Sequence, residues 1–253
     1  MKILQITAII PARYESSRFP GKPLVEINNQ PMIEHVYKRV KKAEVIDQVI
    51  VATDDRRIVE AVKNFGGKVE MTAKDHKSGT DRIAEVAKDL TTDIIVNVQG
   101  DEPLIKPVMI DQIVNPFADN EELIMTTLKK KIADLNEINN PNVVKVVTDI
   151  NDFALYFTRA TVPYQRDDKS GHVDYYKHIG VYAFRRDFLL KYSEMNPSKL
   201  EQIESLEQLR ALENGYDIKV IETAFDTVGV DTPEDLGYVK ELIKRENTDY
   251  RLE

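Results

Sequence analysis

The sequence predicts an α/β fold with a largely parallel sheet, because short apolar runs alternate along the chain with amphipathic segments. The first amphipathic segment, Met32–Ala43, carries Ile33, Val36, Tyr37 and Val40 at helical spacing on one face. Strands that are separated by helices of this length are joined by right-handed crossovers, which set neighbouring strands parallel.

The individual elements can be placed in chain order. The expected strands are Gln5–Ile10, Gln48–Thr53, Lys68–Met71, Asp93–Gln99, Ile124–Leu128, Val143–Asp149, Ala154–Thr158, His178–Phe184 and Ile218–Thr223. The expected helices are Met32–Ala43, Ile58–Phe65, Ile83–Leu90, Leu200–Leu212 and one that begins at Thr232.

The two late helices have distinct boundary signals. Ser198-Lys199-Leu200-Glu201 is a capping box, and Asn214-Gly215 marks the end of that helix. Thr232-Pro233-Glu234-Asp235 supplies an N-cap, a proline at the first position and acidic residues in the first turn. Helical spacing over Leu200–Leu212 predicts a core stripe and a solvated polar face. The stripe is Leu200, Ile203, Leu206 and Leu209/Arg210, and the polar face is Glu204, Glu207 and Gln208.

The chain length of 253 residues suits a single domain over residues 1–253. The strand pattern lapses between Ala160 and Tyr176, where Arg166–Gly171 is polar and rich in turn-forming residues. We therefore expect a protruding hairpin or loop around residues 160–176 and no domain boundary there.

Composition excludes several classes of protein. The net charge of −8 disfavours a nucleic-acid partner and requires any anion site to be a local cluster of cations. The absence of cysteine excludes disulfides, thiolate metal sites and a cysteine nucleophile. No apolar run approaches the roughly 18 residues of a membrane span, and the apolar start is too short for a signal peptide. We expect a cytoplasmic protein that does not bind membranes.

The segment Pro11–Pro23 follows the first strand and combines three cations, Arg13, Arg18 and Lys22, with two serines and a glycine. Such a loop at the carboxyl end of a sheet favours a polyphosphate ligand. It is not a P-loop, because Lys22 precedes a proline and more loop rather than a hydroxyl residue and a helix. GxGxxG is also absent, which argues against a dinucleotide-binding dehydrogenase. A solvated loop with scattered charge is the alternative.

Carboxylates follow two other expected strands. Asn97–Pro103 leads from a buried strand into a turn that contains Asp101 and Glu102, and Val228–Pro233 places Asp231 directly before a helix. Mg²⁺ prefers oxygen ligands and typically takes one or two carboxylates together with substrate phosphates. Asp101 and Asp231 are therefore the candidate metal ligands. The alternative is that Asp101 is a turn residue and Asp231 a helix cap.

Three further features have both a functional and a structural interpretation. Ser78-Gly79-Thr80 enters a helix whose N-terminus favours anions, but Thr80 could simply be its N-cap. Arg159 ends a buried strand and suits carboxylate recognition, and a solvated arginine is the alternative. His178 opens a strand, where a hydrogen-bonded structural histidine is the commoner case.

An ordered set of motifs extends from about Ile9 to Leu236. Its segments are Pro11-Ala12-Arg13 with Pro20-Gly21-Lys22-Pro23, Asp75–Arg82, Asn97–Pro103, Asn140–Val147, Ala154–Pro163, His178–Tyr182, Leu206–Arg210 and Gly229–Leu236. The set closely resembles the 3-deoxy-manno-octulosonate cytidylyltransferase family, the CMP-Kdo synthetases. Single motifs of the set also occur in related sugar nucleotidyltransferases, but the whole set in this order is specific to the family that it resembles.

The resemblance implies a Rossmann-like fold of the nucleotide-diphospho-sugar transferase type, a homodimer, and a reaction that uses Mg²⁺ and CTP to activate Kdo for lipopolysaccharide assembly. By matching motif, the catalytic residues would be Arg13 and Lys22 on the CTP phosphates and Asp101 and Asp231 on magnesium. The nucleotide group would further include Ser78 and Gly79, which help to read the cytosine, and Arg82. The Kdo pocket would be lined by Gln99, Arg159, Arg166, His178, Tyr182, Glu207 and Gln208.

The chain departs from the family pattern at a few positions. Gln202 stands where many members have histidine, Tyr164-Gln165 replaces an aromatic-acid pair, and the stretch after Arg166 is short. These departures concern the sugar pocket rather than the reaction. The alternatives that stay open are a cytidylyltransferase for another acidic sugar, such as 8-amino-Kdo or a sialic acid, a non-catalytic CTP-binding module, and a structural interaction protein.

Overall fold

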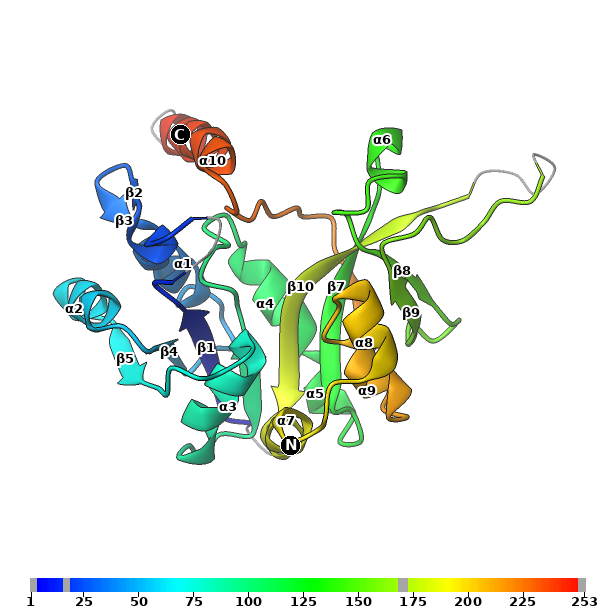
Figure 1. Ribbon diagram of the computed structural model, residues 1–253, viewed down its shortest axis with the longest axis horizontal. Helices are drawn as coiled ribbons and strands as arrows, with labels where there is room; N and C mark the ends of the chain where they lie inside the picture. Colours follow the sequence, from blue (N-terminus) through cyan, green and yellow to red (C-terminus); the bar gives the residue numbers. More distant parts are fainter. Residues whose placement is uncertain (1–3, 16–18, 168–172, 250–253) are drawn as a thin grey trace. The chain divides into compact units, whose positions relative to one another are not determined.

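The computed structural model describes residues 4–15, 19–167 and 173–249 (Figure 1). The chain folds as two compact units: unit 1 comprises the residues up to Asp111 and from Thr227 onward, and unit 2 comprises Gln112–Asp226. The single domain expected from the sequence stays a prediction.

Unit 1 is built on a parallel sheet with the order β6-β1-β4-β5. The central strand β1 is buried at every position, and Ile9 pairs with Ile50 on one side and Asn97 on the other. Burial on both faces explains the continuous apolar run from which the strand was predicted. The strands are β1 (Ile6–Ala12), β4 (Gln48–Thr53), β5 (Lys68–Met71) and β6 (Ile94–Asn97).

The helices of unit 1 pack their apolar stripes inward. Ile33, Val36 and Val40 of the first helix are all fully buried, as their spacing predicted. The last helix contributes Val239 and Ile243 to a second apolar cluster of unit 1. The helices are α1 (Met32–Val40), α2 (Arg56–Asn64), α3 (Gly79–Lys88), α10 (Pro233–Asp249) and the 3₁₀ turn η1 (Lys22–Leu24).

A two-stranded hairpin, β2 (Glu26–Ile27) and β3 (Gln30–Pro31), was not predicted. Its turn is Asn28-Asn29, with φ values of 49° and 60°. Two consecutive asparagines tolerate the left-handed conformation that a two-residue hairpin turn requires. The strands were too short to show an alternating pattern.

Unit 2 contains a mixed sheet. β11 lies parallel to β7, whereas β10 is antiparallel to both β7 and β8, and β9 is antiparallel to β8. β8 and β9 are joined by a short turn, which returns the chain in the opposite direction. The strands are β7 (Met125–Lys131), β8 (Lys145–Thr148), β9 (Ala154–Thr158), β10 (Tyr176–Arg185) and β11 (Lys219–Glu222).

One helix of unit 2 differs from its prediction. Leu200–Leu212 is not a single helix but two, α8 (Lys199–Glu204) and α9 (Leu209–Glu213), separated at Ser205, whose φ is 52°. A left-handed residue ends a helix, so the apolar spacing that crosses it does not define one face. Ile203, assigned to the core stripe, is 68% exposed, and Gln208, assigned to the solvated face, is only 5% exposed.

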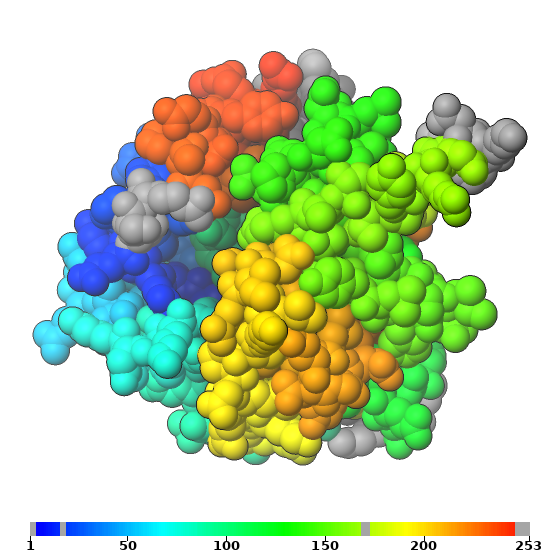
Figure 2. Space-filling view, turned by 45° about the vertical axis from the view of Figure 1, so that its right-hand side comes forward, coloured from blue at the N-terminus to red at the C-terminus, as the bar shows by residue number. Residues whose placement is uncertain are grey.

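Four other helices carried no clear sequence signal. Two of them are four residues long, the third is a mostly apolar segment of eight residues, and the fourth, α7, continues directly from β10. Figure 2 shows α7, α8 and α9 as a continuous yellow-to-orange surface on one side of unit 2. The four are α4 (Pro107–Val114), within which the chain passes from unit 1 to unit 2, α5 (Pro116–Asp119), α6 (Leu135–Ile138) and α7 (Arg186–Ser193).

The expected protruding segment lies in unit 2. Its described parts, 160–167 and 173–175, contain no helix or strand and extend away from the sheet of this unit (Figure 1). Residues 168–172 of the segment, and Ser16, Ser17 and Arg18 of the basic loop, lie outside the described residues. In the part of the chain that the structure describes, no helix is both long and apolar enough to cross a membrane.

Candidate active site

The carboxyl ends of β1 and β6 open onto a polar cavity of about 380 Å³ in unit 1. Six predicted site residues line it: Arg13, Lys22, Gly79, Gln99, Asp101 and Asp231. The other lining residues are Pro11, Ala12, Glu15, Pro23 and Gly100. The structure therefore brings together residues from five separate segments at the sheet edge where α/β folds bind ligands.

Close backbone packing shapes the floor of this cavity. A Cβ atom on Gly100 would lie 2.8 Å from the carbonyl oxygen of Pro11, so no other residue fits there without a shift of the backbone. The turn that begins at Gly100 is thereby held against the end of β1. This contact places Asp101 beside the loop that carries Lys22.

Lys22 joins the two predicted metal ligands. Its Nζ lies 2.5 Å from Oδ2 of Asp101 and 3.2 Å from Oδ1 of Asp231. Burial alone would lower the pKa of Lys22, but the two carboxylates outweigh it and the pKa is raised. Lys22 is therefore charged throughout the neutral range, and the two aspartates converge on one point.

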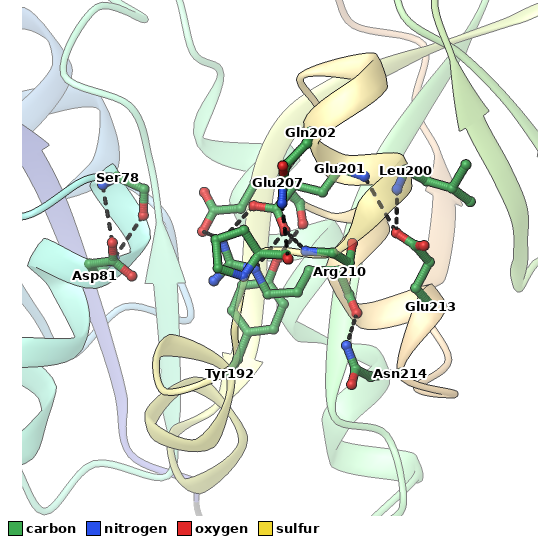
Figure 3. Close-up of polar contacts among 12 residues, drawn as sticks. Ser78, Asp81, Tyr192, Leu200, Glu201, Gln202, Glu207, Arg210, Glu213 and Asn214 are labelled. Carbon is green, nitrogen blue, oxygen red and sulfur yellow. Dashed lines mark hydrogen bonds and ion pairs between the residues drawn. The ribbon is translucent and has the colours of Figure 1, made fainter.

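Ser78 caps α3 in unit 1. Its side chain accepts from the backbone N–H of Asp81, and the Asp81 side chain accepts from the N–H of Ser78 (Figure 3). The N-cap is thus Ser78 and not Thr80, the alternative that the sequence left open. Gly79 follows at the first position, and a Cβ there would lie 3.2 Å from Cγ of Pro11. The start of α3 accordingly faces the cavity through Gly79.

Arg82 does not line this cavity. Its side chain is fully buried, with Nη1 donating to the Thr72 hydroxyl and, at 3.3 Å, to the Ala73 carbonyl. Nη2 lies 3.3 Å from Oδ2 of Asp54. Burial lowers the pKa of Arg82, against the opposing charge of Asp54. These contacts tie the loop before Ser78 to α3, so direct nucleotide contact by Arg82 stays a prediction.

Glu102 is a candidate that sequence reasoning did not assign. It accepts a hydrogen bond from the Thr227 hydroxyl, and its Oε1 is the nearest atom to a Cβ built on Gly229, at 3.2 Å. Burial, followed by the charges of Asp101 and Asp231, raises the pKa of Glu102 to about 7 despite that hydrogen bond. The sequence shows Asp101 and Glu102 as adjacent acidic residues. Only the structure shows that Asp101 lines the cavity while Glu102 has a raised pKa because it is buried.

A second group of predicted residues lies in unit 2, around Arg159. The Arg159 guanidinium donates to the backbone carbonyls of Glu204, at 2.8 Å, and Pro141, at 2.9 Å. Glu204 in turn accepts from the Thr158 hydroxyl and from the Arg159 N–H. Arg159 is therefore not a freely solvated arginine, and Glu204 does not belong to a solvated face.

His178 and Tyr182 both lie on β10, with their ring centroids 5.4 Å apart. The Thr127 hydroxyl lies within hydrogen-bonding distance of the carbonyls of Ile179 and Val181 and, at 3.0 Å, of His178 Nε2. Burial lowers the pKa of His178 to about 3 and raises that of Tyr182 well above its ordinary value. Both side chains are neutral at pH 7.

The turn between α8 and α9 carries Glu207 and Gln208 (Figure 3). Arg210 holds Glu201 in a bidentate pair, with N–O distances of 2.8 and 2.5 Å, and the Tyr192 hydroxyl donates to the Glu207 carbonyl at 2.5 Å. Gln208 Nε2 is buried and has no hydrogen-bond partner among the described residues. An unsatisfied buried donor favours a ligand oxygen at this position.

Two of the positions at which the chain departs from the family pattern, Gln202 and Tyr164, lie on the surface. Gln202 donates to the Pro197 carbonyl on the surface of α8 (Figure 3), and Tyr164 is 84% exposed. Arg166, a predicted sugar contact, is exposed within the 160–167 segment. Its contact with the sugar stays a prediction.

The donor set in unit 1 fits Mg²⁺. Asp101 and Asp231 supply two carboxylates that converge on one cationic group. Among the residues that the structure describes, no cluster of three or more histidine, cysteine or acidic side chains could hold a metal alone. Water and substrate phosphates would complete the coordination, which is the usual arrangement for Mg²⁺.

Comparison with known proteins decides the family. Residues 7–219 match the family model described as cytidylyltransferase. This chain belongs to that family. It is 54% identical over 250 residues to the 3-deoxy-manno-octulosonate cytidylyltransferase of Geobacter sulfurreducens, covering 95% of this chain and 100% of the relative. It is also 54% identical to the enzyme of that name from Fusobacterium nucleatum, over 96% of this chain and 99% of the relative.

Solved structures also support the assignment of this chain to the cytidylyltransferase family. A CMP:2-keto-3-deoxy-manno-octonic acid synthetase in complex with CTP superimposes with a TM-score of 0.91 at 45% identity, covering 96% of this chain and 99% of that one. A putative glucose-1-phosphate thymidylyltransferase from Bacillus anthracis, at 17% identity and a TM-score of 0.65 over 94% of each chain, shows the fold alone. The predicted family and the Rossmann-like, mostly parallel fold are confirmed.

Proposed function

We propose that this nucleotidyltransferase transfers CMP from CTP to the anomeric hydroxyl of Kdo, which yields CMP-Kdo and pyrophosphate. The observation that carries the proposal is the meeting of Lys22, Asp101 and Asp231 in a cavity that also contains Arg13 and Gly79. The similar solved structure that binds CTP supports the nucleotide. The relatives named for Kdo support the sugar and a place in lipopolysaccharide biosynthesis.

On the nucleotide side, Arg13 and Lys22 would bind the phosphates, and the cavity wall at Gly79 would lie against the nucleotide. Asp101 and Asp231 would hold Mg²⁺, which neutralises phosphate charge and lowers the pKa of a coordinated hydroxyl. Such transfers depend mainly on alignment and charge neutralisation. The residues of unit 1 supply both.

On the sugar side, the C2 hydroxyl of Kdo attacks the α-phosphorus in line and the P–O bond to pyrophosphate breaks, with no covalent enzyme intermediate. The Kdo carboxylate requires a cation or several donors. Arg159 and the unpartnered Nε2 of Gln208 are suitable donors in unit 2. The unprotonated ring nitrogen of neutral His178 is a suitable acceptor for a sugar hydroxyl. Gln99 lines the same unit 1 cavity as Asp101 and Lys22.

The proposal extends to a homodimer in the cytoplasm. Leu155 on β9 and Ile203 on α8 are 63% and 68% exposed, and a dimer interface on this unit would cover such side chains. Sedimentation equilibrium at several protein concentrations measures the oligomeric state. A monomer at all concentrations would reject this part of the proposal and leave the activity untouched.

Pyrophosphate release tests the activity. The enzyme is incubated with CTP and Kdo, 8-amino-Kdo or a sialic acid, each with and without Mg²⁺. Release that depends on CTP, Kdo and Mg²⁺ is the expected result. Preference for another sugar would reassign the substrate, and CTP binding without release from any of them would favour a non-catalytic module. No nucleotide binding at all would favour a structural interaction protein.

A further inference from the structure

Lys22 occupies the point on which Asp101 and Asp231 converge. Its ammonium contacts both carboxylates, at 2.5 and 3.2 Å, and its side chain is 12% exposed, compared with 32% and 50% for the two aspartates. The three side chains come from η1, from the turn after β6 and from the turn before α10. A side chain of the protein itself can therefore neutralise the predicted cation site.

The backbone around Lys22 is fixed, while its side chain has a long reach. Gly21 has a φ of +73° and donates from its N–H to the Tyr14 carbonyl at 2.8 Å. A Cβ on Gly21 would lie 3.2 Å from the Tyr14 ring. Pro23, which follows Lys22, is buried. A lysine ammonium on a flexible four-carbon stem can change partners without movement of this anchored backbone.

Phosphate oxygens would be the alternative partners for that ammonium. Arg13 lines the same cavity as Lys22, so a polyphosphate bound there lies within a cluster of cations. A phosphate competes for the lysine, and a divalent cation that accompanies the phosphate competes for the aspartates. Both exchanges replace an ion pair within the protein by one with the ligand.

We propose that Lys22 is an exchangeable internal counter-ion, which blocks the Asp101–Asp231 pair to divalent cations until a nucleoside triphosphate displaces it. The metal then enters together with the nucleotide and not before it. This inference rests on the proposed function in one respect, the assignment of Asp101 and Asp231 as the cation ligands. It adds the order of binding and gives Lys22 a second role.

The test measures Mn²⁺ binding without any nucleotide, by the loss of the electron paramagnetic resonance signal of free Mn²⁺. Mn²⁺ takes the same oxygen ligands as Mg²⁺. Lys22→Met should bind Mn²⁺ at least tenfold more tightly than the unaltered protein, about 1.4 kcal/mol. Lys63→Met removes an equal charge from an exposed position of α2 in the same unit and should leave the affinity within about twofold.

Three more variants locate the site and guard against misfolding. Asp101→Asn in the Lys22→Met background should abolish the gain in affinity, and Lys22→Arg, which keeps the charge, should bind as weakly as the unaltered protein. Lys22→Gln, a second neutral variant, should reproduce Lys22→Met. Thermal melting establishes that each variant is folded before titration.

Equal Mn²⁺ affinity in the unaltered protein and in both neutral variants would overturn the inference. A gain that survives Asp101→Asn would also overturn it, because the cation would then bind elsewhere. The proposed function is judged separately by pyrophosphate release. A tight, Asp101-dependent Mn²⁺ site in Lys22→Met together with no release from the unaltered enzyme would reject the function and keep the counter-ion role.

Discussion

The Lys145 ammonium lies 2.8 Å from the carbonyl oxygen of Arg159, in the interior of unit 2. Lys145 is fully buried and also donates to the carbonyls of Asn140, at 2.9 Å, and Val143, at 2.6 Å. Burial, and then the charge of Arg159, lowers its pKa. Since Arg159 itself binds the Pro141 carbonyl, the two cations together fasten the 140–143 turn to the end of β9.

Lys145→Met should therefore lower the free energy of unfolding by roughly 2–4 kcal/mol, because three partly buried carbonyls lose their donor. Urea unfolding measures the change. Lys199→Met, at an exposed position of α8, is the matched control and should change stability by less than about 0.5 kcal/mol. A loss in Lys145→Met that is no larger than in this control would show that the carbonyls find other donors.

Asp101→Asn and Asp231→Asn should each lower kcat by on the order of 10²-fold or more, since each removes charge from a metal held by few protein ligands. Asp89→Asn makes the same change at an exposed position of unit 1 outside the cavity and should retain activity. Turnover of either site variant close to that of Asp89→Asn at saturating Mg²⁺ would remove that residue from the metal site.

Arg159→Ala should raise the KM for Kdo by at least roughly tenfold and leave the KM for CTP nearly unchanged, about 1.4 kcal/mol on one substrate. The reason is that the guanidinium is the proposed partner of the Kdo carboxylate. Steady-state kinetics with each substrate varied in turn measure both constants. An equal rise for CTP would assign Arg159 to the nucleotide, and no rise for either would leave it only its contacts with Pro141 and Glu204.

Glu102→Gln tests the pH dependence of stability in buffer that contains a metal chelator. The pKa of Glu102 is raised from 4.5 to about 7 in the folded protein, so the folded form binds the proton more tightly than the unfolded form. The stabilisation is complete below pH 4.5 and is lost as the pH rises to 7. Glu102→Gln should thus be more stable than the unaltered protein above pH 7, by roughly 1–3 kcal/mol. Parallel stability curves for the two proteins between pH 4.5 and 8 would refute the raised pKa.

Local patterns in the sequence determined most of the secondary structure. Each expected strand forms, and a short apolar run such as Ile6–Ile10 is typical of a strand that is buried on both faces. The motif order also determined the family. Local patterns failed where a single backbone conformation mattered, as at Ser205, which divides the expected helix over Leu200–Leu212.

Only the tertiary structure decided which distant groups meet and which are buried. Lys22 and Asp231 are 209 positions apart and form an ion pair, whereas the neighbours Asp101 and Glu102 differ in environment, with the pKa of Glu102 raised to about 7. Arg82, predicted as a nucleotide contact from its motif alone, is fully buried and donates to the Thr72 hydroxyl, and neither feature could be deduced from the motif. Residue type and spacing specify a side chain's chemistry, but its partners and its exposure to water depend on how separate elements pack, and these set its charge and its role.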